Sequence, residues 1–394
     1  MNAPNFFVNL LDRYIFKSVL LTCIGAVALF AFVLMLGNAL KELLEPVLAG
    51  QLPLDSTLRL VLLLVPFVIS YALPLGMLTG VLLTLGRLSA DSEITAMRAA
   101  GMSLSRIARP VLLLGALGLA LALYVNFESM PFSRVEYHRQ FAAAMRSNPV
   151  GFIVPKTPIT RFSGVIIYVG EKEYVSEKEG TVLRDFWLWK LDKVGRVQQF
   201  VRAETGSIAF DEASSELVLY LTRAVVESRD EKSPESFAED VPIGISEKMG
   251  PFRLSIDRIF GRDTREQRLD WMTYRQLLAE QARVSAEAFT PETAKDHART
   301  VMKVKLTVQD KINTALAVFS FALVGVPLGI RVSRRETSAN LGVAVMLALG
   351  YYFLTVMVGW LDRHPEYRPD LLLWIPNLAF IGLGLWLFAR IDRR

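Results

Sequence analysis

The stretch LVLLLVPFVISYALPLGMLTGVLLTLG, from Leu60 to Gly86, contains no charged residue. Crossing about 30 Å of hydrocarbon takes about 20 helical residues, and this stretch is longer than that. A single Lys or Arg at its middle would oppose membrane insertion by about 2.5–3.5 kcal/mol. The stretch therefore predicts a transmembrane helix. Two interpretations are open for four prolines and glycines inside it, a moving hinge or a helix-packing site with a proline kink: Pro66, Pro74, Gly76 and Gly80.

Five further uncharged runs share these properties. The six predicted spans are Ser18–Leu40, Leu60–Gly86, Pro110–Phe127, Ile312–Ile330, Leu341–Leu361 and Leu371–Ala389. The chain of 394 residues is 52% hydrophobic and only 21% charged, with a mean hydropathy of +0.34, which excludes an ordinary soluble protein. The first run is too long for the apolar region of a signal peptide. We expect an α-helical membrane protein with six transmembrane helices, three on each side of an inserted segment.

Lys and Arg in the short connections predict the orientation, because cytoplasmic loops carry an excess of them. One side of the predicted spans holds twelve: Arg13, Lys17, Arg87, Arg98, Arg106, Arg109, Arg331, Arg334, Arg335, Arg390, Arg393 and Arg394. The other side holds four in its short loops: Lys41, Arg59, Arg363 and Arg368. This bias predicts that both termini are cytoplasmic and that residues from about Glu128 to Val301 lie outside.

The segment between the third and fourth spans is large enough for a domain with its own core. Four runs rich in β-branched and aromatic residues predict strands: Gly164–Val169, Arg184–Leu191, Val197–Phe210 and Glu216–Glu227. We expect a β sandwich or jelly roll, followed by a helical tether in which Tyr274, Leu277, Leu278 and Gln281 have helical spacing. The expected division is residues 1–127 for the first three spans, 128–301 for the β-rich domain with its tether, and 302–394 for the last three spans.

The connection between the second and third spans, about residues 88–103, is short and charged. Ser89 or Asp91 can cap a helix there, and Gly101 can end it in the left-handed conformation. Glu93 suits the positive end of the helix dipole. Four residues share one side of this helix: Ile94, Met97, Arg98 and Gly101. The pattern predicts an apolar ridge, edged by charge, that docks a cytoplasmic partner. An amphipathic turn that merely rests on lipid headgroups is the alternative.

The run Leu85–Ser103 resembles the helix by which permeases of the LptF/LptG (YjgP/YjgQ) family, part of a lipopolysaccharide-export ABC transporter, engage their ATPase. Phe321–Ile330, with the sequence FALVGVPLGI, is similar to the family's fourth span. The residues that resemble the start of its fifth span are Arg331, Arg334, Arg335, Gly342, Tyr351 and Tyr352. Met272–Leu278 resembles the segment that leaves the family's periplasmic domain. The resemblance covers the whole chain, while the outer strands match only by residue type.

The resemblance implies a function and a set of partners. It implies a multi-pass permease subunit of the bacterial inner membrane that extracts lipopolysaccharide and passes it to a periplasmic jelly-roll bridge protein. The implied partners are a cytoplasmic ABC ATPase dimer and a second permease of the family, or a second copy of this chain. The implied process is cell-envelope biogenesis, and nucleic acid is not an expected partner.

The chain carries no G-x-x-x-x-G-K-[S/T] run that could hold nucleotide phosphates, and no Gly-Lys dipeptide at all. We therefore expect no cofactor and no catalytic site in this chain, with ATP and Mg²⁺ bound by a separate partner. The predicted spans also lack charges suited to ion coupling, which counts against a secondary transporter. With one cysteine, Cys23, and three scattered histidines, we expect neither a disulfide framework nor a metal site.

The fourth predicted span holds Gly325, Pro327 and Gly329 near its cytoplasmic end. Proline removes one backbone hydrogen bond, and glycines allow another helix to approach closely. Two interpretations stay open at this stage. The site is either a hinge that moves during transport or a packing site with a proline kink.

Basic residues also occur just outside the first and third predicted spans: Lys41, Arg134, His138 and Arg139. At headgroup depth they could bind the phosphates of anionic lipids. Basic residues at this depth line the lipid A cavity of the resembling permeases, and Lys41 is the position that the resemblance carries over, with Arg134 and Arg139 as further candidates. The alternative for Lys41 is an ordinary interfacial anchor.

Two rival functions remain. A lipoprotein-releasing type permease would have four spans and a large domain after the first, which this chain contradicts. A membrane-anchored envelope sensor or enzyme would use the β domain to bind a ligand. A co-purifying ATPase whose activity depends on this chain would distinguish these possibilities.

Overall fold

The computed structural model describes residues 10–48, 54–147, 154–159, 164–176, 180–192, 195–211, 216–228, 243–255, 269–287, 294–332, 337–360 and 367–392. The chain divides into two compact units. The first comprises Met1–Ala39, Val61–Glu136 and Arg268–Arg394, and the second comprises Leu40–Leu60 and Tyr137–Gln267. The second unit therefore includes the end of the first long helix, and the helical tether groups with the membrane helices instead of the β-rich domain.

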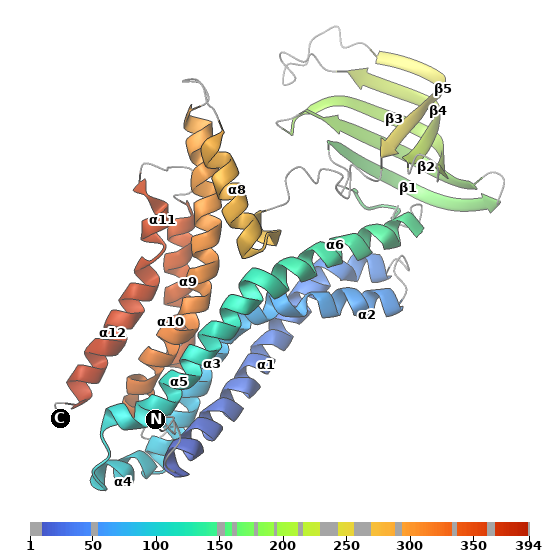
Figure 1. The fold of residues 1–394 in the computed structure, drawn as a ribbon. Helices are drawn as coiled ribbons and strands as arrows, with labels where there is room; N and C mark the ends of the chain where they lie inside the picture. The colour runs from blue at the N-terminus through green and yellow to red at the C-terminus, as the bar shows by residue number, and fades with distance from the viewer. Residues whose placement is uncertain are drawn as a thin grey trace. The chain divides into compact units, whose positions relative to one another are not determined.

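Helices make up the first unit, where long helices lie side by side (Figure 1). In chain order the helical elements of the described residues, in both units, are α1 (Leu10–Leu48), α2 (Leu54–Leu63), α3 (Val65–Ala90), α4 (Glu93–Ala99), α5 (Leu104–Tyr124), the π-helix η1 (Val125–Ser129), α6 (Met130–Ser147), the 3₁₀ turn η3 (Leu269–Trp271), α8 (Tyr274–Ala286), α9 (Ala294–Val332), α10 (Thr337–Gly359), α11 (Pro369–Leu372) and α12 (Ile375–Asp392). Six stretches of the described residues are long and apolar enough to cross a membrane: Leu10–Leu40, Val65–Ala90, Leu104–Phe141, Ala294–Ile330, Gly342–Gly359 and Pro369–Ile391. They confirm the six predicted spans in number and order.

The ends of the spans differ from the prediction for physical reasons. The predicted span Leu60–Gly86 is divided, because α2 ends at Leu63 and α3 begins at Val65. Pro66 lies in the first turn of α3, where its missing N–H costs no helical hydrogen bond. The predicted span Pro110–Phe127 is the middle of a longer continuous helical stretch that runs on into α6. The predicted span ends where the first charged residue occurs, whereas the helix continues past that residue because its backbone hydrogen bonds do not depend on the side chain.

Glycines of α3 let α1 approach its backbone closely. A Cβ atom added to Gly80 would lie 2.6 Å from the Cα of Cys23, and one added to Gly76 would lie 2.7 Å from the backbone nitrogen of Val27. The two glycines are four residues apart, so they share one face of α3. The structure thus shows a close helix contact of the kind that small residues permit in membranes.

The second unit contains a five-stranded antiparallel sheet whose spatial order follows the chain. Its strands are β1 (Val165–Ser176), β2 (Gly180–Leu191), β3 (Val197–Asp211), β4 (Glu216–Ser228) and β5 (Ile243–Ser255). The first four confirm the predicted strands, with β1 and β2 longer than expected. The sequence did not indicate β5, because Gly244, Gly250 and Pro251 interrupt its apolar pattern.

One face of the sheet carries a buried core, and the strands are irregular where they cross its middle. The core residues are Ile167, Val169, Leu183, Phe186, Leu188, Val201, Ala203, Ile208, Leu219, Leu221, Ala224 and Val226. Leu183 and Phe186 both reach this core although they are three positions apart, an odd spacing that places regular strand residues on opposite faces; Asp185 between them has a φ of +51° and shifts the alternation. Arg223 does the same on β4, with a φ of +53°. The described strands form one sheet, and the jelly roll stays a prediction.

Candidate functional site

The predicted docking helix exists as α4, and it is shorter than expected. A turn at Ser92, whose φ is +61°, separates it from α3, and Gly101 ends it with a φ of +87°, in the left-handed region that its pattern predicts. Neither of the two predicted cap residues, Ser89 and Asp91, caps α4. The Ser89 hydroxyl donates a hydrogen bond to the carbonyl of Ile330 at the end of α9 (3.0 Å), and the Asp91 carboxylate lies 4.0 Å from Arg87. Ser89 thus joins the α4 end of α3 to α9.

The apolar side of α4 is buried within this chain. Ile94 is 2% exposed and Met97 is 7% exposed, and both belong to the cluster that contains Leu85, Leu88 and Ile107. The expected outward-facing apolar ridge is therefore wrong for these two residues, because the neighbouring membrane helices cover them. The exposed side consists of small and polar residues with one cation: Thr95, Ala96, Arg98, Ala99 and Ala100. The docking role itself stays a prediction.

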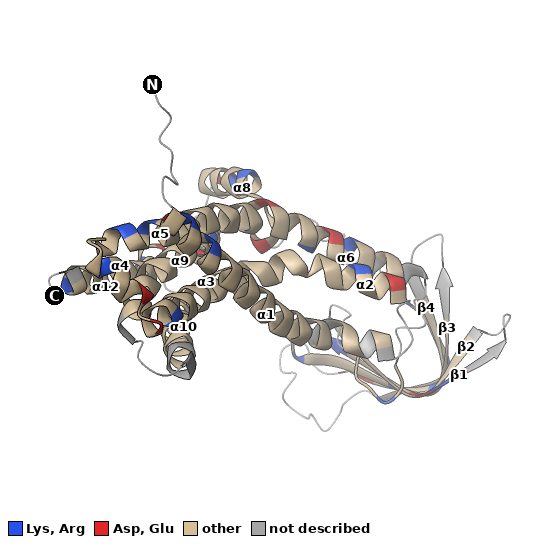
Figure 2. Ribbon diagram, turned by 90° about the horizontal axis from the view of Figure 1, so that it is seen from below, with Lys and Arg blue, Asp and Glu red and all other residues tan. Residues whose placement is uncertain are grey.

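Glu93 has a partner inside the chain. The hydroxyl of Tyr14 on α1 donates a hydrogen bond to the Glu93 carboxylate (3.3 Å), and the side chain of Glu93 stays partly exposed. Arg87 also reaches α1, donating to the Ser18 hydroxyl (3.0 Å). The start of α4 is thus held against the first helix. Lys and Arg gather around α4 and the neighbouring ends of α5 and α12 (Figure 2), while Arg334 and Arg335 lie outside the described residues.

The predicted phosphate-binding residues fall on two helices and in both units. Lys41 lies in α1, in the part that groups with the sheet, and its side chain lies outside the described residues. Arg134 and Arg139 lie on α6. The Arg134 guanidinium sits 4.0 Å from the ring centre of Phe67 on α3, a cation–π contact that fixes its direction.

The Gly325-Pro327-Gly329 site is packed against α3. A Cβ added to Gly325 would lie 3.0 Å from the Val81 Cγ1, and one added to Gly329 would lie 2.9 Å from the Leu85 Cβ. Helix α9 continues through Pro327 to Val332. These close contacts with α3 support the packing interpretation. A hinge at this site stays a prediction.

Sequence reasoning missed a buried polar cluster at the other end of these helices. Ser70 on α3 donates to the Asn126 side-chain oxygen (2.5 Å), and the Asn126 amide donates to the carbonyl of Lys311 (2.9 Å). The Lys311 ammonium donates to the carbonyls of Asp270 and Met272, both at 3.0 Å. Asn126 lies in the π-helix η1, a type of irregularity that is frequent at functional sites.

A second buried polar group adjoins the first along α9. The Asn377 amide on α12 donates to the carbonyl and the side-chain oxygen of Asn313, both at 2.9 Å, and it accepts a hydrogen bond from Ser320 (3.0 Å). Isolated amides inside apolar runs were the sequence signal for both groups. Polar side chains at membrane depth are costly unless they pair with each other, so each such amide predicts a partner on another helix.

Together these features define a class: a multi-span membrane protein with one inserted β domain and a short charged helix at one end of its bundle. The sequence pattern of the family "Lipopolysaccharide export system permease LptF/LptG" matches residues 13–390. The chain belongs to this family, which makes it a transport component of the lipopolysaccharide export system and not a catalytic enzyme.

Curated relatives agree over nearly the whole length. The chain is 21% identical over 385 residues to the lipopolysaccharide export system permease protein LptF of Escherichia coli strain K12, and equally to that of Escherichia coli O157:H7 and of Shigella flexneri. Each match covers 95% of this chain and 93% of the relative. The sequence resemblance to the family is thereby confirmed.

Proposed function

We propose that this chain is the permease subunit that extracts lipopolysaccharide from the inner membrane and passes it through its β domain to a periplasmic bridge protein. One observation carries the proposal. A permease family matches residues 13–390 of a chain that has six apolar helices and one inserted sheet. The rival functions, a lipoprotein-releasing permease and a ligand-binding sensor or enzyme, are not favoured, because the match extends over both the helices and the sheet.

Energy in this proposal comes from a separate ABC ATPase dimer that docks on α4 from the cytoplasm. The exposed side of α4 supports this docking site, because Ala96, Ala99 and Ala100 leave room for a partner while Glu93 and Arg98 can pair with its charges. The Ser89–Ile330 hydrogen bond, at the turn that precedes α4, gives docking forces a route into α9. ATP and Mg²⁺ belong to the partner in this scheme.

The lipid would bind in a cavity shared with a second permease, either a paralogue or a second copy. Helices α1 and α10 present apolar side chains outward, among them Leu29, Phe32, Met346 and Phe353, and such faces suit acyl chains or a partner's helices. Lys41, Arg134 and Arg139 would bind the lipid phosphates at the outer mouth, with both termini in the cytoplasm as the basic residues predict. For Lys41 the competing role is an interfacial anchor.

The direct test is the composition of the complex purified from native membranes in mild detergent. We expect a stoichiometric ABC ATPase, a second permease and bound lipopolysaccharide, the lipid being identified by mass spectrometry. Purification of this chain with neither an ATPase nor a glycolipid would contradict the proposal.

A pair of variants tests α4 within that complex. Glu93→Lys reverses the charge on the docking helix and should release the ATPase. Tyr14→Phe removes the internal hydrogen bond to Glu93 but keeps its charge, so it should retain the ATPase. Release by both variants would mean that Glu93 acts by holding α4 in place. Full ATPase occupancy in Glu93→Lys would exclude α4 as the docking site.

A further inference from the structure

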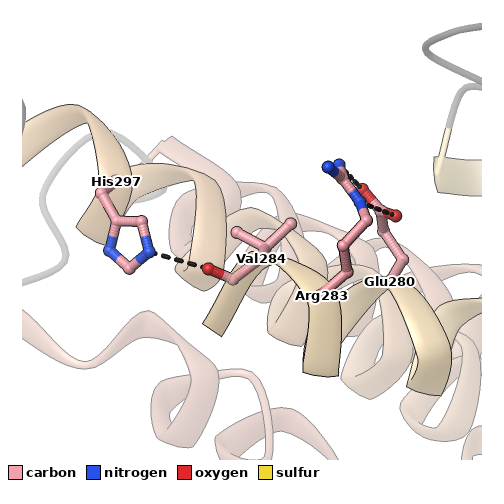
Figure 3. Close-up of polar contacts among 4 residues, drawn as sticks. All are labelled: Glu280, Arg283, Val284 and His297. Atoms are coloured by element: carbon pink, nitrogen blue, oxygen red, sulfur yellow. Dashed lines mark hydrogen bonds and ion pairs between the residues drawn. The ribbon is translucent and has the colours of Figure 1, made fainter. Parts of the chain in front are cut away.

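Helix α8 is fixed along α9 by polar contacts near both of its ends. Near its start, the Lys311 ammonium binds the carbonyls of Asp270 and Met272 (3.0 Å each), just before α8 begins. Near its end, a ring nitrogen of His297 lies 2.8 Å from the carbonyl of Val284 (Figure 3). Between these contacts, Leu277 and Val284 are buried. Helix α8 and the first half of α9 therefore form one antiparallel pair.

Lys311 is an unusual choice for this contact, because it is only 6% exposed. Burying an ammonium group is costly unless it is fully hydrogen bonded, and an apolar side chain of similar size is often as stabilising. Its position above the Phe127 ring, 5.8 Å from the ring centre, offsets part of that cost. Simple packing of α8 against α9 would not need this charge.

The segment that Lys311 holds is the first described element after β5. Residues Leu269–Trp271 form η3, and Thr273 then starts α8 with a capping box in which its side chain and Gln276 bond each other's backbone. Tyr274 packs edge-on against Phe127, with ring centres 5.1 Å apart. The first described segment after the sheet is thus attached to α9 at Leu269–Met272, where Lys311 donates two hydrogen bonds.

The other end of α9 is tied to the region of α4. The hydroxyl of Ser89, at the α4 end of α3, bonds the carbonyl of Ile330, and Gly325 and Gly329 pack on α3 beside it. Lys311 and Ile330 lie on the same helix, about 28 Å apart at 1.5 Å per residue, so α9 connects these two places as one continuous helix.

We propose that Lys311 is a positioning residue for transport: it clamps the Leu269–Met272 segment to α9, so that movement of α9 is passed to the β domain. This inference rests on the proposed function. The clamp itself, the attachment of η3 to α9, can be measured whether or not the proposed function is correct. Removing the ammonium should therefore separate ATP hydrolysis, which occurs in the partner, from delivery of lipid through the β domain.

The test uses the complete complex in proteoliposomes with three variants. Lys311→Met removes the charge at similar length, Lys311→Arg keeps it, and Lys303→Met removes an exposed lysine from the same helix as a control. We expect Lys311→Met to lower ATP-dependent lipopolysaccharide release by about tenfold or more, because two charge-assisted hydrogen bonds are lost, with ATP hydrolysis within about twofold of the wild type. Lys311→Arg should restore most of the release, and Lys303→Met should match the wild type.

The clamp is measured separately by spin-label distances between Arg275→Cys on α8 and Ala298→Cys on α9. The native Cys23 is buried, so the labels attach to the introduced residues. Lys311→Met should broaden this distance distribution, and Lys311→Arg should not. A narrow distribution together with normal release in Lys311→Met would overturn the proposal. A broadened distribution when even the wild type shows no ATP-dependent release would instead count against the proposed function.

The amount of assembled complex is measured for each variant, so that a folding defect is distinguished from a transport defect. Lys311→Gln, which keeps an NH₂ donor group but no charge, provides a second variant if Lys311→Met fails to assemble. Loss of assembled complex in both, with Lys303→Met intact, would assign Lys311 a purely structural role and reject the positioning role.

Discussion

Replacing Gly80 by alanine should separate α1 from α3. The added Cβ would lie 2.5 Å from the Cys23 Sγ, 2.6 Å from its Cα and 2.8 Å from its backbone nitrogen. Carbon atoms in contact prefer separations of about 3.5–4.0 Å, so α1 must move by about 1 Å. Two of the three obstructing atoms belong to the backbone, so a change of side-chain rotamer cannot relieve the clash.

The expected cost follows from this geometry. Overpacking of a core costs about 1–3 kcal/mol, and the shift also loosens the buried α1 residues Ile15, Val19 and Cys23. Alanine in place of a helical glycine returns about 1 kcal/mol. We therefore expect a net loss of up to about 2 kcal/mol in the free energy of unfolding, measured as a lower melting temperature of the detergent-purified protein by tryptophan fluorescence.

Gly25→Ala and Gly37→Ala are the matched controls, because they lie on α1 itself and nothing lies within 4 Å of an added Cβ. Both should leave the melting temperature unchanged or raise it. Adding Cys23→Ala to Gly80→Ala should not rescue stability, because it removes the sulfur and leaves the Cα in place. A Gly80→Ala protein that melts together with the two controls would refute the reasoning.

Three further predictions concern orientation, lipid binding and pH. A cysteine at Ser103 should be labelled only from the cytoplasm. A reporter fused after Asn340 should be cytoplasmic, and one inserted near Ser233 should be periplasmic. Periplasmic labelling of position 103 would reverse the assigned orientation. Lys41→Glu should weaken lipopolysaccharide capture by about tenfold or more while basal ATP hydrolysis persists, as measured by photo-crosslinking from position 41; no adduct there, with adducts from elsewhere in α1, would end the phosphate role. Hydrogen bonds from Arg283 (2.6 and 2.8 Å) lower the pKa of Glu280 below its ordinary value. The pair therefore stabilises the fold at pH values above the ordinary pKa of a glutamate, and this stabilisation is lost as the pH falls through the lowered pKa. Glu280→Gln should therefore show a smaller drop in melting temperature between about pH 7 and about pH 3 than the wild type; because Arg283 is largely exposed, the difference should be small, and an identical drop would contradict it.

The sequence by itself determined the kinds and order of the elements. Runs such as Leu60–Gly86 predict helices because water-free surroundings force each backbone group to bond within its own segment. Runs rich in β-branched and aromatic residues predicted β1 to β4 for a similarly local reason. The failures were also local: β5 was missed at Gly250 and Pro251, and the third span was ended at its first charge.

The candidate site depended on the tertiary structure in a different way. Helical spacing correctly placed Ile94 and Met97 on one side of α4, but spacing cannot tell whether that side meets a partner or the same chain, and here neighbouring helices bury it. The basic flank of the fourth predicted span gave no sign that Lys311 would be buried.

Lys311 shows most directly what only the tertiary structure decided. From the sequence, a lysine at the edge of an apolar run is an interfacial anchor whose ammonium reaches water. In the folded chain, its partners are the carbonyls of Asp270 and Met272, 41 and 39 residues away. A residue's hydropathy is set by its own side chain, and its helical position by the residues near it in the sequence. Its burial and its hydrogen-bond partners are set by segments that only folding brings into contact.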